Sequence, residues 1–88
     1  RPWGRSVWSG RPTAIISQAT GALGGTAANQ QLRLTMSVLD SRILPGNEMY
    51  ISRVASLFDD AGKLDNADTQ TLITGFLRAF EAWMRRFE

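Results

Sequence analysis

The chain has 88 residues, no cysteine and no histidine, and its ten Lys and Arg residues against eight Asp and Glu residues give a net charge of +2. These absences exclude disulfides, thiolate metal sites, cysteine nucleophiles and a histidine general base within the chain, and we assign no catalytic or metal-ligating residue. The basic residues form no dense patch for nucleic acid, and no apolar run approaches the roughly 20 residues that a membrane span needs.

Residues 1–12 (RPWGRSVWSGRP) predict a loop or linker, because they contain two prolines and two glycines and show no helical period. Trp3 and Trp8 in such a loop need a partner surface. We favour packing against protein outside this chain over stacking on a ligand.

The first regular element is a strand predicted over residues 13–19 (TAIISQA), a short apolar run between a proline and a glycine-rich turn. A run of this kind is typical of a buried parallel strand. After the loop Thr20–Gly25, a helix is predicted from Thr26, its expected N-cap, to about Asp40. Its expected buried face consists of residues spaced by three and four: Ala28, Leu32, Met36 and Leu39.

Residues 41–51 predict a second strand, and its interruption by Pro45-Gly46 indicates an edge strand or a bulge. Residues 52–64 predict a connection with a helical turn over Val54–Phe58. The last element is a long helix with Asp65 and Asp68 as a capping pair and an i,i+4 pair of Glu81 with Arg85. Its apolar stripe, interpreted as core packing, comprises Leu72, Ile73, Phe76, Leu77, Phe80, Trp83, Met84 and Phe87.

The order strand, helix, strand, helix predicts an α/β fold with a parallel sheet and crossover helices. Two strands are too few to cover both of these long helices, because a stable α/β sheet is usually wider. We therefore interpret residues 13–88 as half of a doubly wound domain, preceded by the 1–12 linker.

Ligands of open α/β sheets bind beyond the carboxyl ends of the strands, which points to Ser17–Gly21 and the glycine-rich turn after it. The turn matches neither the P-loop nor the G-x-G-x-x-G fingerprint. The pattern is compatible both with a ligand site and with an ordinary strand-to-helix turn. The adjacent Asp59 and Asp60 are interpreted as a solvated acidic loop, not as an acid/base pair.

The order of several segments resembles the NADPH-dependent FMN reductase family, which includes bacterial chromate and quinone reductases. The residues that carry this resemblance are Ser9–Ile16, Gly21–Gly25, Gln31–Arg33, Leu39-Asp40 and Leu44–Glu48. The family pattern is a Gly-Lys-Pro-led strand, a Gly-x-x-Gly-Gly turn and a helix with a Leu-Arg pair. Members often carry Ser where this chain has Gln18 and Ala19, and Arg where it has Ala27-Ala28.

The resemblance implies a flavodoxin-like fold with strand order 2-1-3-4-5, of which this chain supplies strands 4 and 5 and the helices after them, the C-terminal half. The implied cofactors are FMN and NAD(P)H. Ser17, Gln18, Ala19, Thr20 and Gly21 would face the edge of the isoalloxazine ring. Hydride would pass from nicotinamide through flavin to quinone, chromate or a similar acceptor. The loop for the FMN phosphate would lie in the missing half.

The expected partners are the missing N-terminal half or a second copy of the chain, in a homo-oligomer, and a small-molecule electron acceptor. Neither nucleic acid nor membrane is expected, and the expected location is the cytoplasm. The alternative is an inactive half-fold that acts as a self-associating structural or interaction module. A small basic binding domain is a third and weaker reading.

Overall fold

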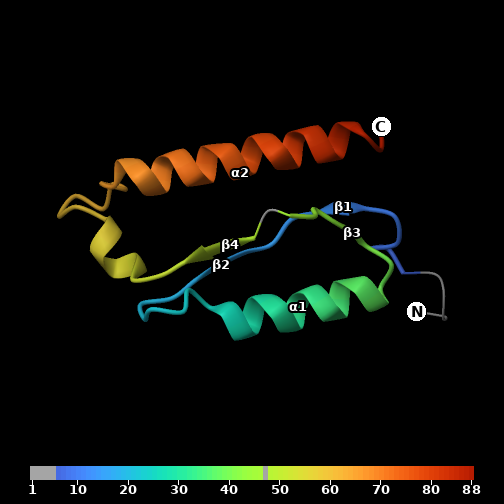
Figure 1. The fold of residues 1–88 in the computed structure, drawn as a ribbon, viewed down its shortest axis with the longest axis horizontal. Coiled ribbons are helices and arrows are strands. Elements are labelled where there is room, and N and C mark those ends of the chain that lie inside the picture. Colours follow the sequence, from blue (N-terminus) through green and yellow to red (C-terminus); the bar gives the residue numbers. More distant parts are fainter. Residues whose placement is uncertain (1–5, 47) are drawn as a thin grey trace.

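The computed structural model describes residues 6–46 and 48–88, in which two helices enclose a thin layer of parallel strands (Figure 1). In chain order the elements are β1 (Pro12–Thr13), β2 (Ile16–Gln18), α1 (Thr26–Val38), β3 (Arg42–Ile43), β4 (Met49–Ile51), the 3₁₀ turn η1 (Val54–Leu57) and α2 (Ala67–Arg85). This arrangement confirms the predicted α/β class. The expectation for Trp3 lies outside the described residues, whereas Trp8 is exposed.

The strands pair in parallel as two short ladders, β1 with β3 and β2 with β4. Ile16 pairs with Met49 and Gln18 with Ile51. The second predicted strand is interrupted around Pro45-Gly46, as its sequence indicates, and Gly46 adopts a left-handed φ of 75° there. The two predicted strands therefore exist, but each is divided in the middle.

Helix α1 does not use Thr26 as its N-cap, so this prediction is wrong. The cap position belongs to Gly25, which has φ 76° and no side chain to accept a hydrogen bond. The Thr26 hydroxyl instead donates to the carbonyl of Leu23, one turn back. The turn before α1 closes through two left-handed glycines, Gly24 and Gly25, and this geometry displaces the hydroxyl from the capping position.

The buried face of α1 also differs from the apolar stripe that we predicted. Of the four predicted residues only Met36 is buried, while Ala28 and Leu32 are exposed. Asn29 is buried on that face, at 1% exposure. The helix is thus rotated so that a polar side chain, which a search for apolar spacing passes over, faces β2 and β4.

The hydrophobic core lies on the opposite face of the strands, under α2. Leu44, Met49 and Phe76 are its buried members, and the half-buried side chains packed against them are Ala14, Ile51, Ile73, Ala79, Phe80 and Trp83. The indole N–H of Trp83 donates to the carbonyl of Arg42 at 2.8 Å, which fixes the C-terminal part of α2 to β3. Half of the predicted α2 stripe is therefore core, whereas Leu72 and Leu77 remain exposed.

The N-cap of α2 is Asn66, not the predicted Asp65. The Asn66 side chain accepts a hydrogen bond from the Thr69 N–H at 2.9 Å, and Asp68 lies in the first turn, where a negative charge is favourable. At the other end of α2, the predicted Glu81–Arg85 pair is present at 2.6 Å.

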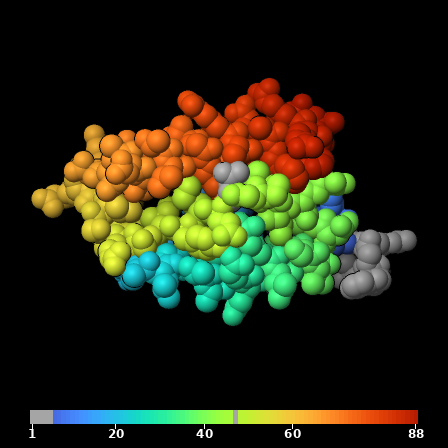
Figure 2. Space-filling model, in the orientation of Figure 1, coloured from blue at the N-terminus to red at the C-terminus, as the bar shows by residue number. Residues whose placement is uncertain are grey.

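The strand layer is narrow. Figure 2 views it from the β3–β4 side, where the chain after α1 fills the space between the two helices. Within the described residues β2 has β4 as its one strand partner, so its other edge is unpaired. Ile16 on this strand is 47% exposed although its neighbour Ile15 is buried. The sheet thus ends where a further strand would continue it.

Candidate functional site

The candidate site is the loop beyond the carboxyl end of β2, beside the carboxyl end of β4. Three backbone hydrogen bonds hold the two strand ends together: the Ala19 N–H donates to the Ile51 carbonyl at 3.0 Å, the Arg53 N–H to the Gly21 carbonyl at 2.8 Å, and the Val54 N–H to the Ala19 carbonyl at 3.0 Å. The loop is therefore fixed along one side by the chain that follows β4.

Two glycines hold the other side of the loop close to the strands. A Cβ on Gly24 would lie 2.9 Å from the backbone carbonyl carbon of Tyr50, and a Cβ on Gly25 would lie 3.0 Å from the Cβ of Ser17. Both residues have left-handed φ angles that other residues adopt only at a cost. These two glycines serve close packing within the fold.

Gly21 is different, because its Cβ would meet nothing within 4 Å. Its φ is not among the positive values, so this position does not need glycine for its backbone conformation. The N–H groups of Thr20, Gly21 and Ala22 donate no hydrogen bond to the part of the chain that the structure describes. The outer side of the loop therefore offers open space and several backbone donors.

The five residues predicted to face a flavin have different surroundings. Gln18, Thr20 and Gly21 are exposed, and Ala19 is half-buried. The Ser17 hydroxyl points inward, where it donates to the Gly24 carbonyl at 2.7 Å and accepts from the Asn29 side chain at 3.0 Å. Gln18, Ala19, Thr20 and Gly21 thus lie along one accessible loop, whereas the Ser17 side chain forms its hydrogen bonds inside the fold.

Asn29 is the residue that sequence reasoning missed. Its Nδ2 donates to Ser17 Oγ and, at 3.4 Å, to the Met49 carbonyl, and its Oδ1 accepts from Arg33 Nε at 3.2 Å. The signal in the sequence was its position four residues after Gly25, on the side of α1 that faces the strands. Because Asn29 is polar, a prediction of the buried face from the spacing of apolar residues does not include it.

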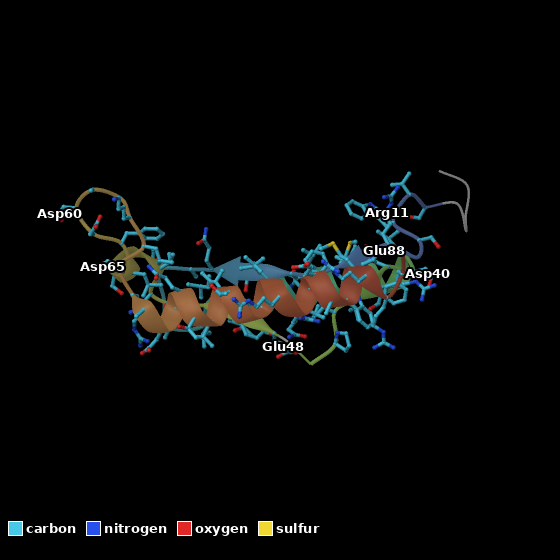
Figure 3. All side chains as sticks on the ribbon, turned by 90° about the horizontal axis from the view of Figure 1, so that it is seen from above. Arg11, Asp40, Glu48, Asp60, Asp65 and Glu88 are labelled. Carbon is cyan, nitrogen blue, oxygen red and sulfur yellow. The ribbon has the colours of Figure 1, made fainter. Side chains whose placement is uncertain are left out.

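Among the described residues, no three acidic side chains come together in a way that could hold a metal ion. Figure 3 shows Asp60 and Asp65 at the end of the molecule where α2 begins, Asp40 and Glu88 at the opposite end, and Glu48 between them. The Asp59 carboxylate accepts from the N–H groups of Ala61 and Lys63, both at 2.9 Å, and so organises its own loop. This placement agrees with a structural role for the Asp59-Asp60 segment.

An open hollow of about 280 Å³ lies next to the candidate site, between β4, η1 and the first turns of α2. Its polar lining residues are Ser52, Arg53, Ser56 and Thr69, and its apolar lining residues include Leu57 and Leu72. Because Arg53 also bonds to Gly21, the hollow and the loop adjoin at the carboxyl end of the strands. This is the region where open α/β sheets bind their ligands.

The chain is similar to quinone reductases and to an FMN reductase over nearly its whole length. It is 44% identical over 85 residues to a quinone reductase of Pseudomonas putida, a match that covers 97% of this chain and 45% of that protein. It is 39% identical to a 2-hydroxy-1,4-benzoquinone reductase of a Burkholderia species and 35% identical to an NAD(P)H-dependent FMN reductase of Pseudomonas aeruginosa, covering 46% and 43% of those proteins. No protein-family model matches the sequence.

The fold agrees with these matches. The flavoenzyme NAD(P)H:(acceptor) oxidoreductase FerB of Paracoccus denitrificans has a TM-score of 0.86 and 26% identity, over 99% of this chain and 48% of FerB. The fold is therefore that of a flavodoxin-like α/β flavoenzyme over about half of such a protein. The resemblance to the NADPH-dependent FMN reductases is confirmed: the chain is a homologue of these reductases and spans about half the length of the relatives it matches.

Proposed function

We propose that this chain forms the flavin-ring side of an FMN-dependent NAD(P)H oxidoreductase that passes electrons to quinone, chromate or a similar acceptor. The observation that carries the proposal is the loop Gln18–Gly21, which lies at the carboxyl end of β2 with open space outside Gly21 and unused backbone donors. The names of the relatives, which include quinone reductases and an FMN reductase, support the reaction class.

The loop suits a flavin edge in its chemistry. The edge of the isoalloxazine ring carries carbonyl oxygens and ring nitrogens, which accept hydrogen bonds from backbone N–H groups such as those of Thr20, Gly21 and Ala22. The absence of a side chain at Gly21 allows the ring to approach the backbone. When bound, FMN supplies the acceptance and onward transfer of hydride, and the protein binds and orients it.

The remaining part of the site is proposed to come from the missing half, as an N-terminal segment or as a second chain. The described loop contains no phosphate-binding motif, and about half of each matched relative lies outside the stretch that this chain spans. We place the protein in the cytoplasm, in accord with its lack of cysteine. No helix in the described ranges is long and apolar enough to cross a membrane.

The test is an FMN titration followed by flavin fluorescence. We expect the 88-residue chain to bind FMN more weakly than micromolar, because the charge-assisted phosphate contacts, worth about 1.5–3 kcal/mol each, are absent. Fusion to the half of the Pseudomonas putida quinone reductase that the chain does not match should restore binding.

In this fusion protein, Gly21→Val should lower FMN affinity at least tenfold with little loss of stability, since its side chain would enter open space and no left-handed φ is required. Unchanged FMN binding by Gly21→Val would show that the loop is only a structural turn.

The alternative is a self-associating module without catalytic activity. The unpaired edge of β2 and the exposed apolar side chains on both helices favour it. The fusion experiment separates the two functions, because an inactive module would gain no flavin affinity from the added half.

A further inference from the structure

The side-chain amide of Asn29 has one possible orientation. Arg33 Nε, 3.2 Å away, can only donate a hydrogen bond, and the Met49 carbonyl, 3.4 Å away, can only accept one. The amide oxygen must therefore face Arg33 and the NH₂ group must face the strands. At 1% exposure no water competes for these groups, so the network keeps this direction.

The direction of the amide determines the direction of the Ser17 hydroxyl. A serine hydroxyl has one proton to donate, and Asn29 Nδ2 already donates to its oxygen at 3.0 Å. The Ser17 proton is thus directed to the Gly24 carbonyl, at 2.7 Å. In this way Asn29 acts through Ser17 on the backbone of the glycine turn.

The glycine turn is the second anchor of the loop. Bonds to Ile51, Arg53 and Val54 fix one side of the loop, and Gly24 leaves no room for a Cβ against the backbone of Tyr50. The hydrogen bond from Ser17 fixes the Gly24 carbonyl at the other side. The exposed donors of the loop lie between these anchors, so their direction depends on both.

We propose that Asn29 is a positioning residue, which fixes the loop Ser17–Gly21 in its ligand-binding arrangement by setting the hydrogen-bond direction of Ser17. The proposal rests on the proposed function in one respect, namely that the ligand is a flavin. Asn29 itself lies behind the loop and does not contact the ligand.

The first test uses the 88-residue chain without flavin and measures hydrogen exchange of the Thr26, Arg53 and Val54 amides, which donate to the carbonyls of Leu23, Gly21 and Ala19. Asn29→Ala and Ser17→Ala should each raise these exchange rates about tenfold relative to the amides of α2. The double variant should show no further increase, because both changes break the same link. Equal protection of these three amides in parent and variants, or additive effects of the two changes, would overturn the proposal.

The second test measures FMN affinity in the fusion protein. Asn29→Ala and Ser17→Ala should each weaken FMN binding about tenfold, whereas Arg85→Ala, which removes the ion pair with Glu81 near the C-terminal end of α2, should leave it unchanged. A purely structural role of Asn29 predicts equal FMN affinity in all folded variants and would contradict the proposal. If the parent fusion binds no flavin, the proposed function fails, and hydrogen exchange still decides the role of Asn29. If Asn29→Ala does not fold, Ser17→Ala alone gives the decision.

Discussion

At the scale of single residues, two left-handed glycines, one in the turn before α1 and one in the loop before α2, are restricted in different ways that the sequence does not reveal. Gly24 combines a left-handed φ of 60° with a Cβ position 2.9 Å from the Tyr50 backbone, whereas Gly62 has φ 81° and open space. The first position is restricted by both conformation and packing, and the second by conformation alone. The pair therefore allows the two costs to be measured separately.

We expect Gly62→Ala to cost about 1–2 kcal/mol, the cost of a left-handed conformation for a residue with a Cβ. Gly24→Ala should cost about 1–3 kcal/mol more, because the added methyl group overlaps the backbone of β4. Urea denaturation of both variants would measure the difference. Equal losses of stability would show that β4 moves away from Gly24 without cost.

At the scale of the elements, α2 divides its apolar residues between core and surface. Phe76 is 4% exposed in the cluster with Leu44 and Met49, whereas the neighbouring Leu77 is 51% exposed. The sequence predicted one continuous stripe because both residues are apolar and close in the helical period. Only the position of the strands decides which of them is covered.

Phe76→Ala should destabilise the chain by about 3–5 kcal/mol, the cost of a large buried truncation. Phe80→Ala should reduce the stability less, because Phe80 is half-buried, and Leu77→Ala should reduce it least. Denaturant unfolding measured by circular dichroism gives the order. A loss for Leu77→Ala equal to that for Phe76→Ala would mean that a partner covers the outer face of α2 in solution.

Sequence reasoning predicted the order of elements, the interruption at Pro45-Gly46 and the turn after β4, because these depend on local signals. It failed at the N-caps of α1 and α2, since the choice between neighbouring polar residues depends on the exact path of the loop. It predicted the loop Ser17–Gly21 as the candidate site, which stays a prediction, but it did not predict the network of Asn29. That network joins α1 to two strands that are distant in sequence, and no local pattern contains it.

At the scale of the whole molecule, the chain is more extended than a complete domain of its length. Its radius of gyration is 15.1 Å, with extents of 48 × 26 × 23 Å. A compact domain of this size has a radius of about 12 Å. The difference agrees with a narrow sheet between two long helices and with a surface that another half would complete.

We therefore expect the chain to associate at micromolar concentration. The unpaired edge of β2 offers backbone groups for pairing, and apolar side chains on both helices, among them Leu34 and Leu72, are more than half exposed. Sedimentation velocity should show a dimer or a larger species. The fusion protein should sediment with less self-association, and a stable monomer of the 88-residue chain with cooperative melting would refute the expectation.

The parallel pairing of β2 with β4 also has a consequence for how the chain acquires its structure. Ile16 meets Met49 only after all of α1 and its flanking turns have been traversed, so closing the ladder carries the entropic cost of a long loop. Helix α1 can form early, from contacts between near neighbours, whereas the ladder is a late event on the folding pathway. During synthesis, β2 therefore remains without its strand partner until Ile51 has emerged from the ribosome.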